Sequence, residues 1–166
     1  GEFFSFRDVT VDPKPQQRPY VPIWIAGRVP SIPRAARYAD VIDPPWPTLN
    51  EVSNVYLPRL AEEAAKWDRA APRLGGWFYA KVSADGLTDS EITAWFDGLM
   101  NQEFEVTPAD LSFAGSAEQC AARIERYLAA GVGHFVLDFQ RHGLETVDTA
   151  MEQMTLFAEE VVPLLG

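Results

Sequence analysis

The chain has 166 residues, 47% of them hydrophobic and 23% charged, which suits one globular domain with a real core. Its formal net charge of −10 opposes binding to nucleic acid or to an anionic lipid surface. One cysteine and two distant histidines exclude a disulfide and the usual zinc sites, and no apolar run is long enough for a membrane helix.

Residues 1–22 predict an extended excursion that leads into the fold, because prolines interrupt their short alternating runs. Residues 23–166 then form one domain, in which a short apolar run is followed by an amphipathic helix four times over. The expected strands cover residues 23–26, 41–43, 77–83 and 134–139. The expected helices cover residues 31–39, 50–68 with a kink at Pro58, 88–102 and 144–164, and residues 103–114 are expected to form a loop.

One further helix is indicated by its boundary residues. Ser116 and Gln119 form a capping-box pattern, and the helix behind them is expected to end at Gly131. The alternation of strands and helices predicts an α/β fold of parallel strands with outer helices. The last helix is expected to bury an apolar face made of Val147, Met151, Met154, Phe157, Ala158 and Val161.

Several runs of this sequence resemble the bacterial-luciferase-like family, which contains FMN-dependent monooxygenases and deazaflavin-dependent oxidoreductases. A run in the middle of the family's chains is similar to residues 11–16, 21–27 and 34–40, which read VDPKPQ, VPIWIAG and RAARYAD. Later family segments are similar to residues 115–118, 127–137 and 157–165. The resemblance implies the C-terminal half, strands five to eight, of a TIM (βα)8 barrel. In the family, the first half supplies much of the cofactor pocket and most candidate catalytic side chains.

The loop after the first expected strand carries the sharpest candidate site. Gly27 lets the backbone approach a ligand closely, and Arg28 and Ser31 add donors suited to phosphate. The resemblance implies that Gly27, Arg28, Val29 and Ser31 bind the phosphate of an FMN or deazaflavin coenzyme. Pro30 removes one N–H that would otherwise be available to phosphate. The alternative is an ordinary strand-to-helix turn with a solvated arginine.

Asp43 and Trp46 follow the second expected strand and are also candidate cofactor-binding residues, since Trp46 has a ring that can stack on a flavin. The alternative for both is a rigid, proline-rich turn over the barrel rim. His142 follows the last strand and is the catalytic candidate by residue type, with a solvated loop as the alternative. His134 begins its strand and Cys120 lies on the apolar face of a helix, so both are expected to be structural.

The expected function is that of a fragment of a luciferase-like flavin-dependent oxidoreductase or monooxygenase that acts on a small organic substrate in the cytoplasm. Such a fragment is incomplete as an active site alone. The alternative is a non-catalytic half-barrel that assembles as a homodimer or binds the missing N-terminal half, because its first and last strands would have unpaired edges. Its open interior is expected to be lined by Trp24, Phe78 and Phe135 or by their alternating neighbours.

Overall fold

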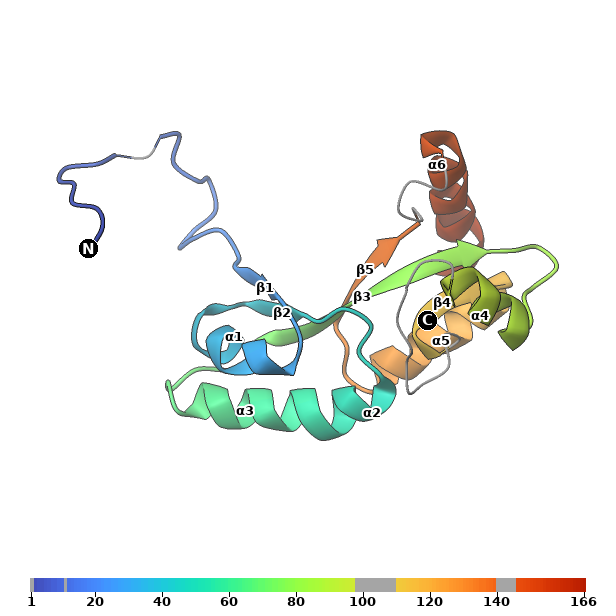
Figure 1. Cartoon of the computed structure of the whole chain (residues 1–166), viewed down its shortest axis with the longest axis horizontal. Helices are drawn as coiled ribbons and strands as arrows, with labels where there is room; N and C mark the ends of the chain where they lie inside the picture. Colours follow the sequence, from blue (N-terminus) through green and yellow to red (C-terminus); the bar gives the residue numbers. More distant parts are fainter. Residues whose placement is uncertain (1, 11, 98–109, 140–145) are drawn as a thin grey trace.

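The computed structural model describes residues 2–10, 12–97, 110–139 and 146–166, and its five strands form one parallel sheet (Figure 1). The strands are β1 (Trp24–Ala26), β2 (Val41–Asp43), β3 (Arg73–Val82), β4 (Ser112–Gly115) and β5 (His134–Asp138). The α-helices are α1 (Ile32–Tyr38), α2 (Leu49–Glu51), α3 (Leu57–Ala65), α4 (Asp89–Asp97), α5 (Ala117–Ala129) and α6 (Val147–Leu156). The described residues before β1 form no helix or strand and extend away from the sheet (Figure 1).

The four expected strands are confirmed as β1, β2, β3 and β5, and every neighbouring pair is parallel. β3 begins at Arg73 rather than at Trp77. The prediction started too late because glycine has a low strand propensity, yet Gly75 and Gly76 belong to the strand. A Cβ at Gly75 would lie 2.9 Å from the Asp43 Oδ1 atom, so any side chain at this position would force the Asp43 carboxylate to shift.

Residues 112–115 form β4 where the sequence predicts a loop, and that expectation is wrong. Their side chains are buried, and their backbone pairs with the last residues of β3, in the register Tyr79 to Ser112 through Val82 to Gly115. The run is short and contains small residues and a glycine, so it carries little strand propensity of its own. Pairing with β3, a tertiary contact, therefore determines its conformation.

β3 is the central strand of the sheet, with β2 and β4 following one another along one of its edges. Trp77 accepts a backbone hydrogen bond from Trp46 at 2.9 Å, and Ser83 donates one to Gly115 at 2.8 Å. Positions 77 and 83 are an even number of residues apart, so their backbone groups point to the same edge. β5 pairs with the other edge of β3. Within the described residues, no strand pairs with the outer edge of β1 or of β5.

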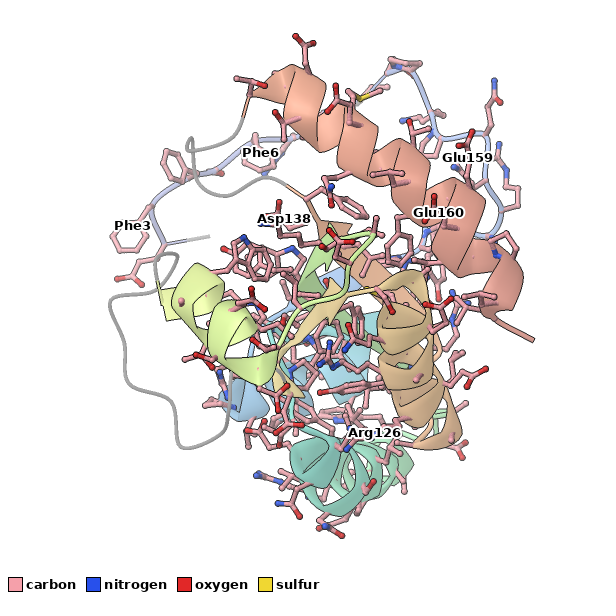
Figure 2. The ribbon with its side chains drawn as sticks, turned by 90° about the vertical axis from the view of Figure 1, so that its right-hand side faces the viewer. Phe3, Phe6, Arg126, Asp138, Glu159 and Glu160 are labelled. Carbon is pink, nitrogen blue, oxygen red and sulfur yellow. The ribbon has the colours of Figure 1, made fainter. Side chains whose placement is uncertain are left out.

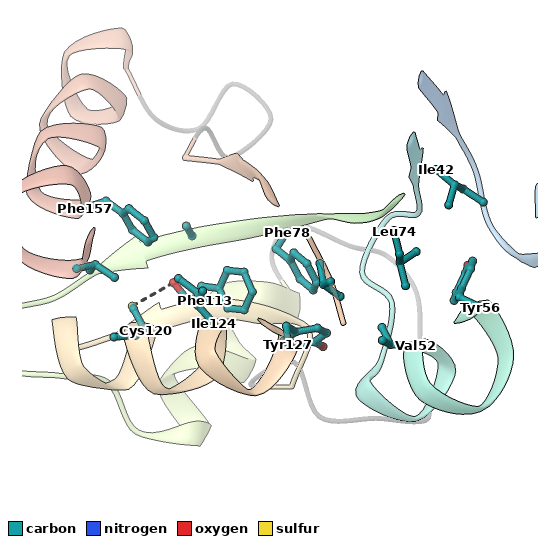
Figure 3. Close-up of a cluster of buried hydrophobic side chains, with 14 of the residues drawn as sticks. Ile42, Val52, Tyr56, Leu74, Phe78, Phe113, Cys120, Ile124, Tyr127 and Phe157 are labelled. Carbon is teal, nitrogen blue, oxygen red and sulfur yellow. Dashed lines mark hydrogen bonds between the residues drawn. The ribbon is translucent and has the colours of Figure 1, made fainter. Parts of the chain in front are cut away.

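The main hydrophobic core lies between the sheet and the helices on its outer side (Figure 3). Phe78 of β3 contacts Phe113 of β4 and Tyr127 of α5, with ring centroids 4.5 Å and 4.8 Å away. Cys120 belongs to this core as expected; its thiol donates to the Phe113 carbonyl at 3.3 Å, and burial raises its pKa to about 11. A thiol with so high a pKa is unreactive at neutral pH.

Phe78 and Phe135 belong to this outer core, so the inner face of the sheet is formed by the alternating neighbours instead. Tyr79 and Trp77 of β3 pack there against Trp46, and Trp95 and Phe96 of α4 lie over Tyr79. The inner face is therefore aromatic at the C-terminal end of β3, and α4 covers part of it.

The expected helix over residues 50–68 runs from α2 through a π-helical segment, Val52–Tyr56, into α3. Leu57 donates its N–H to the Val52 carbonyl, and this wider turn immediately precedes Pro58, which has no N–H to donate. The expected irregularity at Pro58 is thus a π-helical turn. The capping box of Ser116 and Gln119 is confirmed at the start of α5, with bonds of 3.2 Å and 2.7 Å.

The expectation that the last helix buries its whole apolar face is wrong. Phe157 and Val161 are buried, in a π-helical segment that follows α6 (Phe157–Val161). Val147, Met151 and Met154 are instead 69%, 55% and 49% exposed, and Ala158 is exposed as well. The physical reason is that no described element lies against this part of α6. An exposed apolar stripe of this kind marks a contact surface.

Candidate functional site

An open hollow of about 450 Å³ follows β1, at the carboxyl end of the strand, where ligands bind in parallel α/β proteins. It is lined by Ala26, Gly27, Arg28, Pro30, Ser31 and Arg34. Three of the four residues predicted to bind phosphate therefore line one depression. Val29, the fourth, begins a short 3-10 helix (Val29–Ser31) and packs against the hydrophobic core.

Gly27 has a backbone conformation that the site requires. Its φ of +145° lies in a region that residues with a side chain rarely adopt, and a Cβ there would lie 2.8 Å from the Ser31 hydroxyl. Gly27 donates its N–H to the Asp43 carbonyl at 3.3 Å, and Ser31 donates its N–H to the Arg28 carbonyl at 2.8 Å. The Ser31 hydroxyl also donates to that carbonyl, at 2.7 Å. The N–H groups of Gly27 and Ser31 and the Ser31 hydroxyl are thus already used, and the arginine side chains are the charged donors that line the hollow.

Arg28 is held by a salt bridge across the loop. Its Nη2 atom lies 3.2 Å from the Glu51 Oε1 atom, and the two side chains are 48% and 24% exposed. Glu51 is itself the third residue of a capping box, in which its Oε2 atom accepts the Thr48 N–H at 2.9 Å. The carboxylate is therefore fixed at the start of α2, and it fixes the guanidinium beside the hollow.

Asp43 ends β2 on the inner face, where its carboxylate occupies the space above Gly75. Its Oδ1 atom is buried and has no hydrogen-bond partner among the described residues. Burial raises the pKa of Asp43, and the positive charge of His134 lowers it by a smaller amount. A buried carboxylate oxygen without a hydrogen-bond partner is costly, so this position is a candidate for a role beyond packing.

His134 lies in the same layer of the inner face as Asp43. It pairs in register with Gly75, and its ring meets the Trp24 ring edge-on at 4.5 Å. The contact joins β1 to β5, the two outer strands of the half-barrel. The sequence contains a signal for this position of His134. Side chains that point inward recur at every second residue of a strand, so the position of His134 in its strand indicates the inner face.

Trp46 lies at the centre of the aromatic inner face, next to the end of β2. Its φ of +44° is unusual for a bulky residue, and such backbone strain is concentrated at functional sites. The Trp46 ring stacks on Tyr79 at 5.7 Å and contacts Trp77 at 4.9 Å. Burial raises the pKa of Tyr79, and the charge of Asp138 raises it further. Sequence reasoning missed Trp77 and Tyr79, whose inward direction follows from the full extent of β3.

The structure brings two of the predicted groups of site residues together. Gly27 donates to Asp43 across the β1–β2 pair, so the hollow and the inner aromatic face adjoin. His142, the catalytic candidate, lies outside the described residues. Arg34 and Glu51, which border or reach the hollow, were not among the predicted residues.

A second cavity, of about 220 Å³, lies on the helix side of the sheet, between the start of α2 and α5. Tyr127 closes its base, since its hydroxyl lies 2.9 Å from the carbonyls of Pro47 and Asp110. Arg126 borders it from the exposed side of α5 (Figure 2). The remaining lining residues are Thr48, Leu49, Asn50 and Arg123. The walls of this cavity come from helices and loops, and not from the ends of strands, where the candidate site lies.

Two classes of site are absent from the described part of the chain. None of its helices has both the length and the apolar character to cross a membrane. In the same residues, His, Cys, Asp and Glu side chains do not gather in groups of three or more that can hold a metal ion.

No protein-family model matches the chain, and a search of curated proteins gave no match. Solved structures do match. An F420-dependent secondary alcohol dehydrogenase, in complex with an F420–acetone adduct, has a TM-score of 0.72 at 19% identity, over 100% of this chain and 55% of that chain. A coenzyme F420-dependent tetrahydromethanopterin reductase from Methanopyrus kandleri has a TM-score of 0.65 at 15% identity, over 88% of this chain and 51% of that one.

An EDTA monooxygenase from Chelativorans sp. BNC1 matches with a TM-score of 0.61 at 16% identity, over 92% of this chain and 45% of that chain. The chain thus spans about half the length of these solved structures. At such identities the likeness concerns the fold. The chain has the α/β fold of half a TIM barrel, as the resemblance to the bacterial-luciferase-like family implies.

Proposed function

We propose that this chain is the C-terminal half of a flavin- or deazaflavin-dependent oxidoreductase, and that the hollow at residues 27–34 binds the phosphate of the coenzyme. The observation that carries the proposal is the position of two arginines and a positive-φ glycine directly after β1, at the ligand-binding end of a half-barrel. The solved proteins of the same fold include enzymes that are F420-dependent and others that are monooxygenases.

The residues of the hollow fit a phosphate group. Arg28 and Arg34 supply charge-assisted donors, and Gly27 leaves the approach to the backbone clear of a Cβ. The coenzyme supplies the redox chemistry when bound, and this chain binds and orients it. Trp46, with the inner aromatic face around it, offers a flat apolar wall for the ring system or for a small organic substrate.

The arrangement of strands supports the further proposal that a second half-barrel completes the site. β1 and β5 each present an outer edge with no strand partner in the described residues, and Val147, Met151 and Met154 form an exposed apolar stripe on α6. A separate N-terminal half fits these edges, and so does a second copy related by a two-fold axis along the barrel, which keeps all strands parallel. In the second case the chain is a non-catalytic or self-assembled half-barrel. The cytoplasmic location stays a prediction.

A fluorescence titration with FMN tests the coenzyme site. We expect the Arg28→Ala variant to bind FMN more weakly by about 1.5–3 kcal/mol, the value of a lost hydrogen bond to a charged group. Arg59→Ala is the matched control, because Arg59 is exposed on α3 and does not line the hollow. Equal affinity of wild type and Arg28→Ala would remove Arg28 from the site.

A further inference from the structure

The charged groups around the hollow sum to a single positive charge. Arg28 and Arg34 line it, and Glu51 lies 3.2 Å from Arg28. Arg34 forms no ion pair with any described residue. It follows Ser31 by three residues, so it lies one turn further along the same face. Arg34 is therefore the positive charge at the hollow that no carboxylate offsets.

Glu51 is not free to turn away from Arg28. Its Oε2 atom accepts the Thr48 N–H, and its own N–H donates to the Thr48 hydroxyl at 3.0 Å. Moving the carboxylate would break the cap of α2. The negative charge of Glu51 is thus a permanent feature of the hollow, built into the start of a helix.

We propose that Glu51 sets the charge selectivity of this hollow, because its negative charge offsets that of Arg28 and so weakens the preference that two arginines would have for a doubly charged phosphomonoester over a singly charged phosphodiester. The inference rests on the proposed function and refines it. A phosphomonoester carries about −1.5 to −2 charges at pH 7, whereas a diester carries one. Each unmatched positive charge in the hollow favours the second negative charge of the monoester, so a carboxylate that cancels one of two cations reduces this preference. FMN ends in a monoester, and the phosphate of the deazaflavin coenzyme is a diester, so Glu51 would discriminate between the two coenzymes.

The test compares FMN with its monomethyl phosphate ester, which shares the ring and ribityl chain of FMN but carries one negative charge fewer. Riboflavin, which has no phosphate, is the neutral reference. Flavin fluorescence reports the affinity of each ligand for the wild-type chain and its variants. We expect the wild-type chain to prefer FMN over the ester by no more than about fivefold, the effect of one unmatched unit charge that is screened by water.

Four variants separate the effect of Glu51 from that of the arginines. Glu51→Gln keeps the capping box, because glutamine serves at that position too. This variant should increase the affinity for FMN, relative to the affinity for the ester, by about tenfold. The double variant Glu51→Gln with Arg28→Gln restores one net positive charge and should restore the wild-type preference. Arg34→Gln should weaken both phosphates and leave riboflavin unchanged. Glu63→Gln, which alters a carboxylate paired with Lys66 elsewhere, should change nothing.

Two results would overturn the inference in different ways. If Glu51→Gln leaves the ratio of FMN to ester affinity unchanged while both ligands still bind, Glu51 does not set selectivity and the proposed function stands. If the wild-type chain binds none of the three flavins, or binds riboflavin as tightly as FMN, the phosphate site itself is absent and the inference fails with it.

Discussion

Asp43 is the residue at which packing and chemistry conflict most clearly. Its Oδ1 atom is buried without a hydrogen-bond partner in the described residues, and burial raises its pKa. The unfolded chain therefore releases this proton at a lower pH than the folded chain. Ionisation of Asp43 therefore lowers the free energy of unfolding as the pH rises. This loss of stability is absent below the ordinary carboxyl range, where both states are protonated, and it is complete above the raised pKa of the folded state.

Asp43→Asn should relieve this penalty, because the amide has a similar shape and no charge. We expect the variant to be more stable than wild type at pH 7, by less than about 1 kcal/mol, because Asp43 is only partly buried and water screens its charge. The difference should shrink as the pH falls through the raised pKa toward the ordinary value. Urea unfolding at several pH values measures it, and a variant less stable than wild type at neutral pH would show that Asp43 is satisfied by a group that stabilises its charge.

Gly75 is the partner of Asp43 across the sheet, and its missing side chain makes room for the carboxylate. Gly75→Ala would place a Cβ 2.9 Å from Asp43 Oδ1 and 3.4 Å from two backbone oxygens. We expect a loss of about 1–3 kcal/mol in the free energy of unfolding. Gly133→Ala is the control, because no atom lies within 4 Å of its added Cβ, and it should cost less than about 0.5 kcal/mol.

At the scale of elements, one side chain replaces a strand at the edge of β3. β5 pairs with β3 only as far as Tyr79. Beyond it, the Gln153 side chain of α6 accepts the Val82 N–H at 2.7 Å and donates to the Val82 carbonyl at 3.2 Å. The amide thus makes the two hydrogen bonds of a neighbouring peptide group and ties α6 to the sheet.

Gln153→Leu should break both bonds while keeping a side chain of similar length. We expect a loss of about 1–3 kcal/mol and faster hydrogen exchange at the Val82 amide. Glu152→Leu, at the exposed neighbouring position, should leave that exchange rate unchanged. Unaltered protection of Val82 in Gln153→Leu would mean that another group covers this edge.

Elements with strong local signals were predictable, and those determined by distant contacts were not. The Ser116 capping box and the run at residues 23–26 specify α5 and β1 locally. β4 is held by burial and by pairing with β3, which no window of its own residues reveals. The apolar stripe of α6 has the right periodicity, but no described element packs on Val147, Met151 and Met154, so they stay exposed.

At the scale of the whole molecule, the surfaces that bear on assembly are the open edges of β1 and β5 and the exposed face of α6. A half-barrel of this kind should self-associate, because buried apolar area outweighs screened charge repulsion at −10. We expect sedimentation at micromolar concentration to show a dimer, and Met151→Glu to reduce the dimer fraction more than Ser53→Glu does. A compact, cooperatively unfolding monomer would contradict the assembly.

The candidate site was predictable in position but not in its electrostatics. The residues after β1 carry their own signal, a glycine followed by an arginine and a serine at a strand end. The salt bridge of Arg28 with Glu51 and the ring contact of Trp24 with His134 join distant parts of the chain. Only the tertiary structure brings these pairs together, so no local pattern contains them.

The central claim is that the hollow after β1 is the coenzyme-phosphate site of a half-barrel. Amide NMR spectra recorded during an FMN titration of the wild-type chain test it most directly. The account predicts that the largest saturable shifts occur at Gly27, Arg28, Ser31 and Arg34, and that riboflavin does not reproduce them. Shifts centred on Asn50 and Arg126, at the helix-side cavity, with none at residues 27–34, would contradict it.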